Sequence, residues 1–250
     1  MKISELLKQD KVTLSFEVFP PKTSSSYESV ARATQEIAAL RPDFMSVTYG
    51  AGGGTSEHTV NIAADLKKKY DVTVLTHLTC VSSTREHVAK MVQKYKENGI
   101  ENILALRGDI PEGGAPHSDY HYAAELVRDI KSQGDFCIGG ACYPEGHVEA
   151  ANKTEDILHL KEKVEAGCEF LTTQMFFDNN IMYNFLYRIR EKGITVPIIA
   201  GIMPVTNVNQ IKRITSMSGT SISVSAGDIF EISIWCYAAG AYSISVKTRD

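Results

Sequence analysis

Short runs of apolar and β-branched residues alternate along the chain with longer segments in which apolar residues recur every three or four positions. The short runs predict seven β-strands, at residues 12–19, 44–50, 72–80, 102–109, 137–144, 170–177 and 196–204. The longer segments predict amphipathic helices between the strands, among them residues 26–40, 84–99, 154–167 and 180–193. Successive strands start about 30 residues apart, which is the size of a βαβ unit and favours a parallel sheet covered by helices.

Residues at the ends of these helices agree with the same pattern. Thr84 and Thr154 stand where an N-cap is expected. Glycines that could adopt a left-handed C-terminal cap follow several of the helices, at Gly99, Gly134, Gly167 and Gly193.

Two α/β architectures fit this order of elements: a (β/α)8 TIM barrel and an open doubly wound sheet. Polar residues near the carboxyl ends of the strands help to choose between them: Glu17, Tyr49, His77, Arg107 with Asp109, Tyr143 and Gln174. Six consecutive strands thus bring polar groups to one end, as in the mouth of a barrel, whereas an open sheet gathers them at one switch point. We therefore favour one barrel domain over residues 1–250.

The glycine-rich segment 49–59 follows the second strand and precedes a helix, so a dinucleotide-binding fingerprint has to be considered. Thr55 occupies the position of the third glycine, and no acidic residue ends the next strand. The segment is therefore interpreted as a flexible turn or as a loop whose backbone approaches a flat ligand closely.

Composition narrows the class of partner. The 250 residues are 43% hydrophobic and 22% charged, with a formal net charge of −4. This balance favours a small-molecule ligand and gives no reason to expect nucleic acid or a membrane as a partner. The amino-terminal segment lacks the apolar stretch of a signal peptide and no run is long enough to span a bilayer, so a cytoplasmic location is expected.

Cysteine and histidine patterns argue against metal sites and disulfides. The five cysteines form no C-x-x-C pair, and the seven histidines show no ligand spacing such as H-E-x-x-H. We expect reduced, mostly buried thiols and no metal. No G-x-S-x-G motif is present, which argues against nucleophilic hydrolysis.

Glu17 is the principal candidate for chemistry. It alternates with Leu14, Phe16 and Val18, so its carboxyl group is predicted to point into the barrel. A buried glutamate can form a structural ion pair, here with Arg107, or can be tuned for proton transfer. Burial would raise its pKa, as a general acid near neutral pH requires, and the residues alone leave both interpretations open.

Seven segments, taken in order, closely resemble the bacterial methylenetetrahydrofolate reductases: "FEVFPPK" (16–22), "SVTYGAGG" (46–53), "THLTC" (76–80), "ALRGD" (105–109), "CYPEGH" (142–147), "TTQMFFD" (172–178) and "GIMPVTN" (201–207). The resemblance covers residues 12 to about 218. It implies a (β/α)8 barrel that binds FAD and reduces 5,10-methylenetetrahydrofolate to 5-methyltetrahydrofolate with NADH or NADPH in a ping-pong scheme. It further implies a role in one-carbon metabolism and methionine biosynthesis, self-association into a homo-oligomer, and the option of a partner subunit.

The resemblance also assigns roles to residues. Glu17 falls on the family's catalytic general acid, Asp109 on a residue between the flavin and the folate, and Gln174 and Gln210 on folate contacts. The positions that match FAD contacts are Thr48, Tyr49, Ala51, His77, Arg107, Gly108, Asp109, Ala123, Tyr143, His147, Ala150, Asp156, His159 and Lys163. His159 and Glu162 depart from the family, whose members often have Asn and Arg at these positions.

The character of the chain changes in the tail, residues 221–250. The tail is rich in serine and isoleucine and has no lysine or arginine before Lys247. The family's eighth strand and its late tyrosine and arginine are not recognisable there. We therefore expect seven clear β/α units and an incomplete barrel with an atypical tail.

Overall fold

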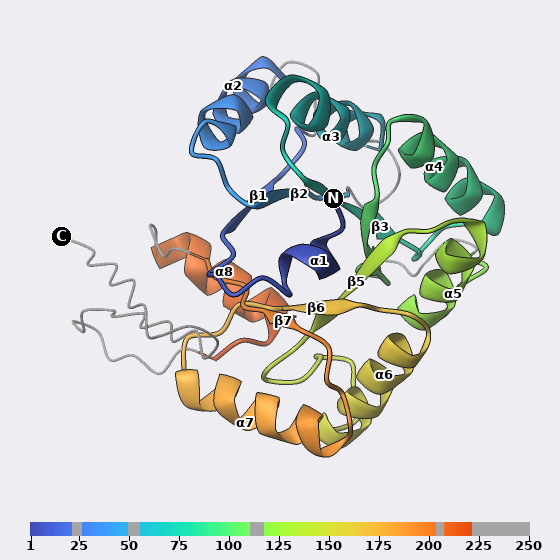
Figure 1. The fold of residues 1–250 in the computed structure, drawn as a ribbon. Coiled ribbons are helices and arrows are strands. Elements are labelled where there is room, and N and C mark those ends of the chain that lie inside the picture. Colours follow the sequence, from blue (N-terminus) through green and yellow to red (C-terminus); the bar gives the residue numbers. More distant parts are fainter. Residues whose placement is uncertain (22–26, 50–55, 111–117, 204–207, 222–250) are drawn as a thin grey trace. The chain divides into compact units, whose positions relative to one another are not determined.

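The computed structural model describes residues 1–21, 27–49, 56–110, 118–203 and 208–221. Seven strands form one parallel sheet in the order β1 to β7 (Figure 1). They are β1 (Ser15–Val18), β2 (Phe44–Val47), β3 (Val74–Thr79), β4 (Asn102–Leu106), β5 (Cys137–Cys142), β6 (Phe170–Thr173) and β7 (Ile198–Ile199). The strand order follows the chain order, as in a barrel, and confirms the predicted fold of an incomplete (β/α)8 barrel.

Helices alternate with the strands along the chain. They are α1 (Ile3–Leu6), α2 (Tyr27–Ala38), α3 (Ser56–Tyr70), α4 (Arg85–Glu97), α5 (Ala123–Gln133), α6 (Lys153–Glu165), α7 (Asn179–Glu191) and α8 (Val208–Ser218). The tail beyond Ser221 and the glycine-rich residues 50–55 lie outside the described residues.

The chain divides into two compact units. Unit 1 comprises residues 1–9, 13–140 and 165–170, and unit 2 comprises residues 10–12, 141–164 and 171–250. Unit 1 holds β1 to β4 with α1 to α5, whereas unit 2 holds β7, α7, α8 and nearly all of α6. The division falls inside β5 and β6, so each of these strands has residues in both units.

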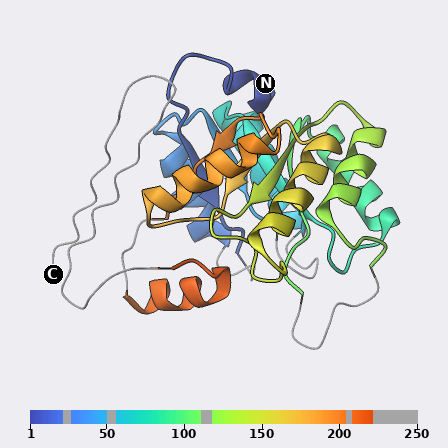
Figure 2. The same ribbon diagram turned by 90° about the horizontal axis from the view of Figure 1, so that it is seen from below.

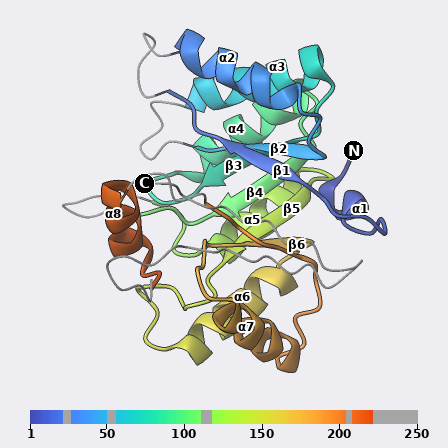
Figure 3. The ribbon, with the colours of Figure 1, turned by 90° about the vertical axis from the view of Figure 1, so that its left-hand side faces the viewer.

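The core of unit 1 lies between the strands and the helices that cover them. All four residues of β2 and all six of β3 are buried. Figure 3 shows α2 and α3 side by side over these strands, and Leu66 of α3 is fully buried. Strands covered in this way read as continuous apolar runs, which is why the sequence pattern located them.

Unit 2 has its own core between α6 and α7, which lie next to each other (Figure 2). Ile157 and Leu160 of α6 pack in one cluster with Met182, Phe185 and Ile189 of α7. Each set recurs at a spacing of three or four residues, so each helix presents one apolar face to the cluster.

Two of the predicted helix ends differ in the structure. Thr84 caps α4 as predicted, since its hydroxyl accepts from the His87 amide at 3.2 Å. Thr154 lies inside α6 instead of capping it. The side-chain oxygen of Asn152 accepts from the amides of Thr154 and Glu155, both at 3.0 Å, and so takes the capping role.

The glycine predictions divide in a similar way. Gly99, Gly167 and Gly193 have positive φ angles of 66°, 125° and 78°, as expected of left-handed caps. Gly134 has a φ of 171°, so its backbone is extended and the predicted cap is wrong.

Lysines near the ends of three successive helices of unit 1 each reach the end of the next helix. Lys67 of α3 donates to the carbonyl of Gly99 after α4, and Lys96 of α4 donates to that of Gln133 in α5. Lys131 of α5 donates to Phe136 at 2.8 Å and pairs with Glu169 at 2.7 Å. These cations satisfy carbonyls at helix carboxyl ends and stabilise one end of the unit.

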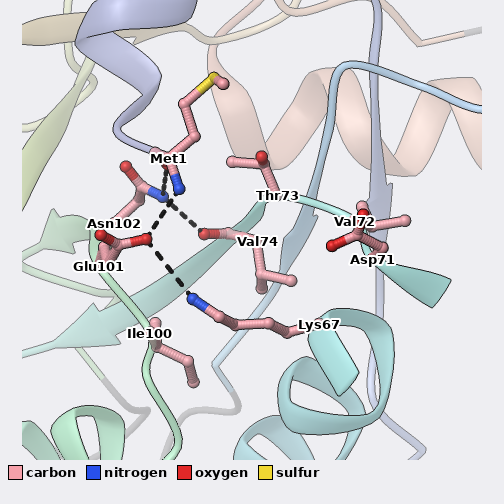
Figure 4. A pocket seen from close by; sticks show the side chains of 9 residues that line it. All are labelled: Met1, Lys67, Asp71, Val72, Thr73, Val74, Ile100, Glu101 and Asn102. Carbon is pink, nitrogen blue, oxygen red and sulfur yellow. Dashed lines mark hydrogen bonds and ion pairs between the residues drawn. The ribbon is translucent and has the colours of Figure 1, made fainter. Parts of the chain in front are cut away.

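Asn102 at the start of β4 links the amino-terminal segment to β3. Its side-chain oxygen accepts from the Ile3 amide at 2.8 Å, and its amide group donates to the carbonyls of Met1 and Val74, both at 3.1 Å. A cavity of about 230 Å³ lies beside it, lined also by Lys67, whose ammonium group is 3.5 Å from Glu101 (Figure 4). This cavity is at the starts of β3 and β4, at the opposite ends of the strands from the predicted site residues.

We expect the Asn102→Leu variant to lose about 2 to 4 kcal/mol of unfolding free energy, because three backbone groups lose their buried partners. Urea unfolding would measure the loss. Asn98→Leu at the half-buried end of α4 is the control and should cost under about 1 kcal/mol. Equal losses in the two variants would contradict the structural role given to Asn102.

Candidate functional site

Three polar side chains from β1, β2 and β3 meet in unit 1. Glu17 pairs with Ser46 in the register of β1 and β2, and the Ser46 hydroxyl donates to Glu17 Oε2 at 3.3 Å. Nε2 of His77 on β3 lies 3.3 Å from the same oxygen. The sequence correctly predicted that Glu17 and His77 lie at the carboxyl ends of their strands, and the structure brings them together.

His77 is buried among apolar strands and is neutral at ordinary pH. Burial lowers the pKa of its imidazole to about 4, because the charged form would lose its hydration. Although Glu17 is close, Nε2 has no hydrogen-bond partner of good geometry in the part of the chain that the structure describes. The Tyr95 hydroxyl of α4 donates to the His77 carbonyl at 3.1 Å and fixes this part of β3.

Glu17 has a carboxyl group whose proton is held more firmly than usual. Burial raises its pKa, and the hydrogen bond from Ser46 opposes this shift. Its side chain still has 44% of its surface exposed, so one side of the carboxyl group is accessible. No cation of the described residues shifts its pKa, which favours the proton-transfer interpretation over an ion pair with Arg107.

The end of β2 is held by neighbouring helices. Thr59 of α3 donates to the Thr48 carbonyl at 2.9 Å, and the Tyr49 hydroxyl lies 2.9 Å from Nε2 of His87 in α4. Thr48 and Tyr49 therefore have fixed positions just before the glycine-rich segment. Ala51, predicted to contact the cofactor, lies outside the described residues.

The segment after β4 carries Arg107, Gly108 and Asp109. Arg107 is half-buried and Asp109 is exposed. Gly108 has a φ of 88°, and a Cβ atom there would lie 2.7 Å from Cγ1 of Val81. A side chain at this position would be both strained and crowded, so glycine is required. Ala123 is buried as the first residue of α5.

In unit 2 the predicted cofactor residues lie after β5 and along α6. The rings of Tyr143 and His147 meet edge to face with centroids 4.6 Å apart. Lys163 donates to the Ala141 carbonyl at 2.5 Å and is thereby held against the end of β5. Ala150 and Asp156 are half-buried.

His159 and Glu162, the two positions that depart from the family pattern, are neighbours on α6. Nδ1 of His159 lies 3.5 Å from the Glu162 carboxylate, and Nε2 lies 3.8 Å from that of Glu155. The histidine thus stands between two carboxylates, so this helix face is more acidic than one carrying Asn and Arg.

Of the two predicted folate contacts in unit 2, Gln174 is half-buried just after β6. Its backbone amide donates to the Cys142 carbonyl at 2.7 Å, and its side-chain oxygen accepts from the Met175 amide at 2.9 Å. Gln210 belongs to α8, and its side chain lies outside what the structure describes.

Sequence reasoning missed Ser46. A serine in an apolar strand carries no charge, and its importance depends on which residue of β1 lies opposite. The available signal was the alternation of Ser46 with buried residues, which places its hydroxyl on one face of the strand.

The residues of unit 1 offer one observation that fits a bound cofactor. His77 is both a predicted FAD contact and the owner of a buried ring nitrogen without a good partner. Buried polar atoms are normally satisfied, so a ligand group is a suitable partner for Nε2. Arg107 in unit 1, and His147 and Lys163 in unit 2, supply the cationic donors that a pyrophosphate requires.

Other kinds of site find no support in the described ranges. No group of three or more His, Cys, Asp or Glu side chains there could hold a metal ion. No helix of this part is long and apolar enough to cross a membrane. Cys80, Cys137, Cys142 and Cys168 are free and buried, and burial raises the pKa of Cys80 and Cys142 to about 12, which makes both thiols unreactive.

Comparison with known proteins gives a family match over most of the chain. The family model described as "Methylenetetrahydrofolate reductase" matches residues 2–233. The match includes the first part of the atypical tail and ends before residues 234–250.

Two curated relatives illustrate the similarity. The "5,10-methylenetetrahydrofolate reductase" of Pectobacterium carotovorum subsp. carotovorum is 40% identical over 215 residues, covering 86% of this chain and 71% of that protein. The "Probable methylenetetrahydrofolate reductase (NADH)" of Oryza sativa subsp. japonica is 36% identical, covering 88% of this chain and 40% of that protein.

A solved structure supports the fold. It is titled "Uncharacterized protein from Clostridium thermocellum binds two copies of 5-methyl-5,6,7,8-tetrahydrofolic acid" and matches with a TM-score of 0.65 at 15% identity. The match covers 89% of this chain and 76% of that one.

The neutral state of His77 leads to a prediction about acid stability. Because its pKa is lowered in the folded state, the unfolded chain takes up the proton first as pH falls below about 6.5. From pH 7.5 to 4.5 His77 should therefore cost about 2 to 3 kcal/mol of unfolding free energy.

Denaturant unfolding at the two pH values measures this cost. The His77→Gln variant should lose that much less stability on acidification than the wild type, whereas the exposed control His121→Gln should behave as the wild type does. Equal acid sensitivity of the wild type and the His77→Gln variant would contradict a buried neutral imidazole.

Proposed function

The chain belongs to the methylenetetrahydrofolate reductase family, and on this premise we propose that it reduces 5,10-methylenetetrahydrofolate to 5-methyltetrahydrofolate with NADH or NADPH through bound FAD. The names of the relatives support the substrate, and the rice relative's name supports NADH as one donor. The observation that carries the proposal is the carboxyl group of Glu17. Burial raises its pKa, and a neutral imidazole and a hydroxyl group surround one of its oxygens.

Glu17 acts as the general acid in this proposal. Its O–H bond breaks and the proton goes to the folate nitrogen, while the carbon–nitrogen bond of the five-membered ring opens to leave an iminium ion. A hydride then converts the iminium carbon to the methyl group. Glu17 remains as a carboxylate that must regain a proton before the next turnover, so its pKa has to lie near the working pH.

FAD, when bound, supplies a carrier that takes a hydride from the nicotinamide nucleotide and passes it to the folate in a ping-pong scheme. In unit 1, His77, Arg107 and the end of β2 would hold it. In unit 2, His147 and Lys163 would contact the pyrophosphate, and Asp156 would accept hydrogen bonds from ribose hydroxyls.

Asp109 and Gln174 complete the proposed folate site. Asp109 is exposed just after β4, where a carboxylate can accept hydrogen bonds from the pterin's donor groups. Gln174 can both donate and accept, and its side-chain oxygen would exchange its bond to the Met175 amide for a ligand contact.

A second candidate is a family member that binds FAD or folate without turnover. The family match ends at residue 233, which leaves the end of the atypical tail without a counterpart in the family model. A barrel whose eighth strand was replaced would expose strand edges and hold the substrate less firmly.

Two absorbance measurements on the purified full chain separate the candidates. A flavin spectrum that NADH or NADPH bleaches, and that methylenetetrahydrofolate restores, is the result expected of the reductase. A flavin spectrum that neither nucleotide bleaches would leave binding without turnover. The ratio of the two bleaching rates gives the nucleotide preference, and light scattering gives the oligomeric state.

The Glu17→Gln variant should retain bleaching by the nicotinamide nucleotide and lose recovery by folate, with a rate at least about 100-fold lower, because Gln cannot donate a proton as an acid. Stopped-flow absorbance measures both half-reactions. The exposed control Glu36→Gln on α2 should leave both rates unchanged. Equal survival of both half-reactions in the Glu17→Gln variant would contradict the assignment of the general acid.

A further inference from the structure

We propose that Ser46 is a positioning residue for Glu17: its hydroxyl holds Oε2 of the carboxyl group against His77 and stabilises the carboxylate that remains after proton donation. This inference rests on the proposed function for its catalytic consequence. Its structural part concerns only the chain's own residues.

The register of the sheet places Ser46 for this role. Ser46 is the direct partner of Glu17 across β1 and β2, so the two side chains share one face. It is 7% exposed within a strand whose other residues, Phe44, Met45 and Val47, are buried and apolar. A buried hydroxyl requires a hydrogen-bond partner, and the carboxyl oxygen 3.3 Å away is the acceptor.

His77 closes the other side of the same oxygen. Its Nε2 is 3.3 Å from Oε2, so both contacts of the carboxyl group fall on one atom. In the described part of the chain no side chain contacts Oε1. The enclosed oxygen therefore orients the group, and the second oxygen is the one that can reach a ligand through the exposed part of the side chain.

The chemistry of proton donation explains why a hydroxyl suits this position. When Glu17 gives up its proton, the electron pair of the O–H bond remains on the carboxyl group and creates a charge in a crowded apolar frame. Burial makes this anion unfavourable, and a hydrogen bond donated by Ser46 favours it. Ser46 thus keeps Glu17 acidic enough to release the proton.

Few ionisable groups compete with this effect. The side chains that face Glu17 from the neighbouring strands are Ser46 on β2 and His77 on β3, and only His77 can titrate. Because His77 is neutral above pH 5, it does not change its charge in the range in which Glu17 is examined. Within the described residues, no other charged side chain shifts the pKa of Glu17.

The test compares the Ser46→Ala variant with the wild type by carbon-13 NMR of the full chain labelled in its glutamate carboxyl groups. The Glu17 signal is identified by its loss in the Glu17→Gln variant. Without the hydrogen bond to the anion, the acid dissociation constant of Glu17 should fall by about threefold to tenfold, which moves its titration midpoint to higher pH. This readout requires neither folate nor cofactor turnover.

The pH profile of the folate half-reaction gives the catalytic readout. Its rate should fall as pH rises, since the acid form of Glu17 is lost, and in the Ser46→Ala variant this fall should move to higher pH by the same factor. Ser46→Thr keeps the hydroxyl and should restore the wild-type position. A purely structural role would lower the rate at every pH without moving the profile.

Ser83→Ala provides a matched control. Ser83 is also 7% exposed, and its hydroxyl also donates over 3.3 Å, but to the backbone carbonyl of Thr79. This variant should leave the Glu17 titration and the pH profile in place.

The outcomes distinguish the two proposals. A shifted NMR titration without any folate reduction would support Ser46 as the partner of Glu17 and overturn the proposed function. Folate reduction with an unshifted titration and pH profile in the Ser46→Ala variant would overturn the role of Ser46 and leave the proposed function standing.

Discussion

The parallel register of β1, β2 and β3 brings one carboxyl group, one hydroxyl and one imidazole to the same face of an otherwise apolar sheet. All three groups depend on burial for their properties. His77 is neutral because its charged form cannot be hydrated, and Glu17 holds its proton more firmly for the same reason. A shift of one residue in this register would turn the three side chains to the other face and remove the site.

Elements that carry no chemistry hold this register in place. Tyr95 of α4 fixes the carbonyl of His77, and Thr59 of α3 fixes that of Thr48. At the other ends of the strands, Asn102 joins β4 to β3, and the lysines of α3, α4 and α5 each tie one helix end to the next. Both ends of unit 1 are therefore constrained, although only one end holds the candidate site.

The sequence predicted the parts of this arrangement that depend on local patterns. Strands buried on both faces read as apolar runs, and the alternation along β1 placed Glu17 on the correct face. It did not predict Ser46, because the partner of a serine across two strands follows from a register that no single strand contains. Thr154 was mistaken for the cap of α6 because Asn152, two residues earlier, is an equally good capping residue and the structure uses it. Gly134 was mistaken for a left-handed cap because glycine adopts extended backbone as readily.

The central claim is that Glu17 donates a proton to the folate and takes one back when the reaction runs in reverse. The most direct test measures the folate half-reaction in both directions over a range of pH. The forward rate should fall and the reverse rate should rise as pH increases, with one common midpoint at the Glu17 titration, because the same group must be an acid in one direction and a base in the other. Two rates that change in the same direction with pH, or that do not respond to it, would contradict the claim.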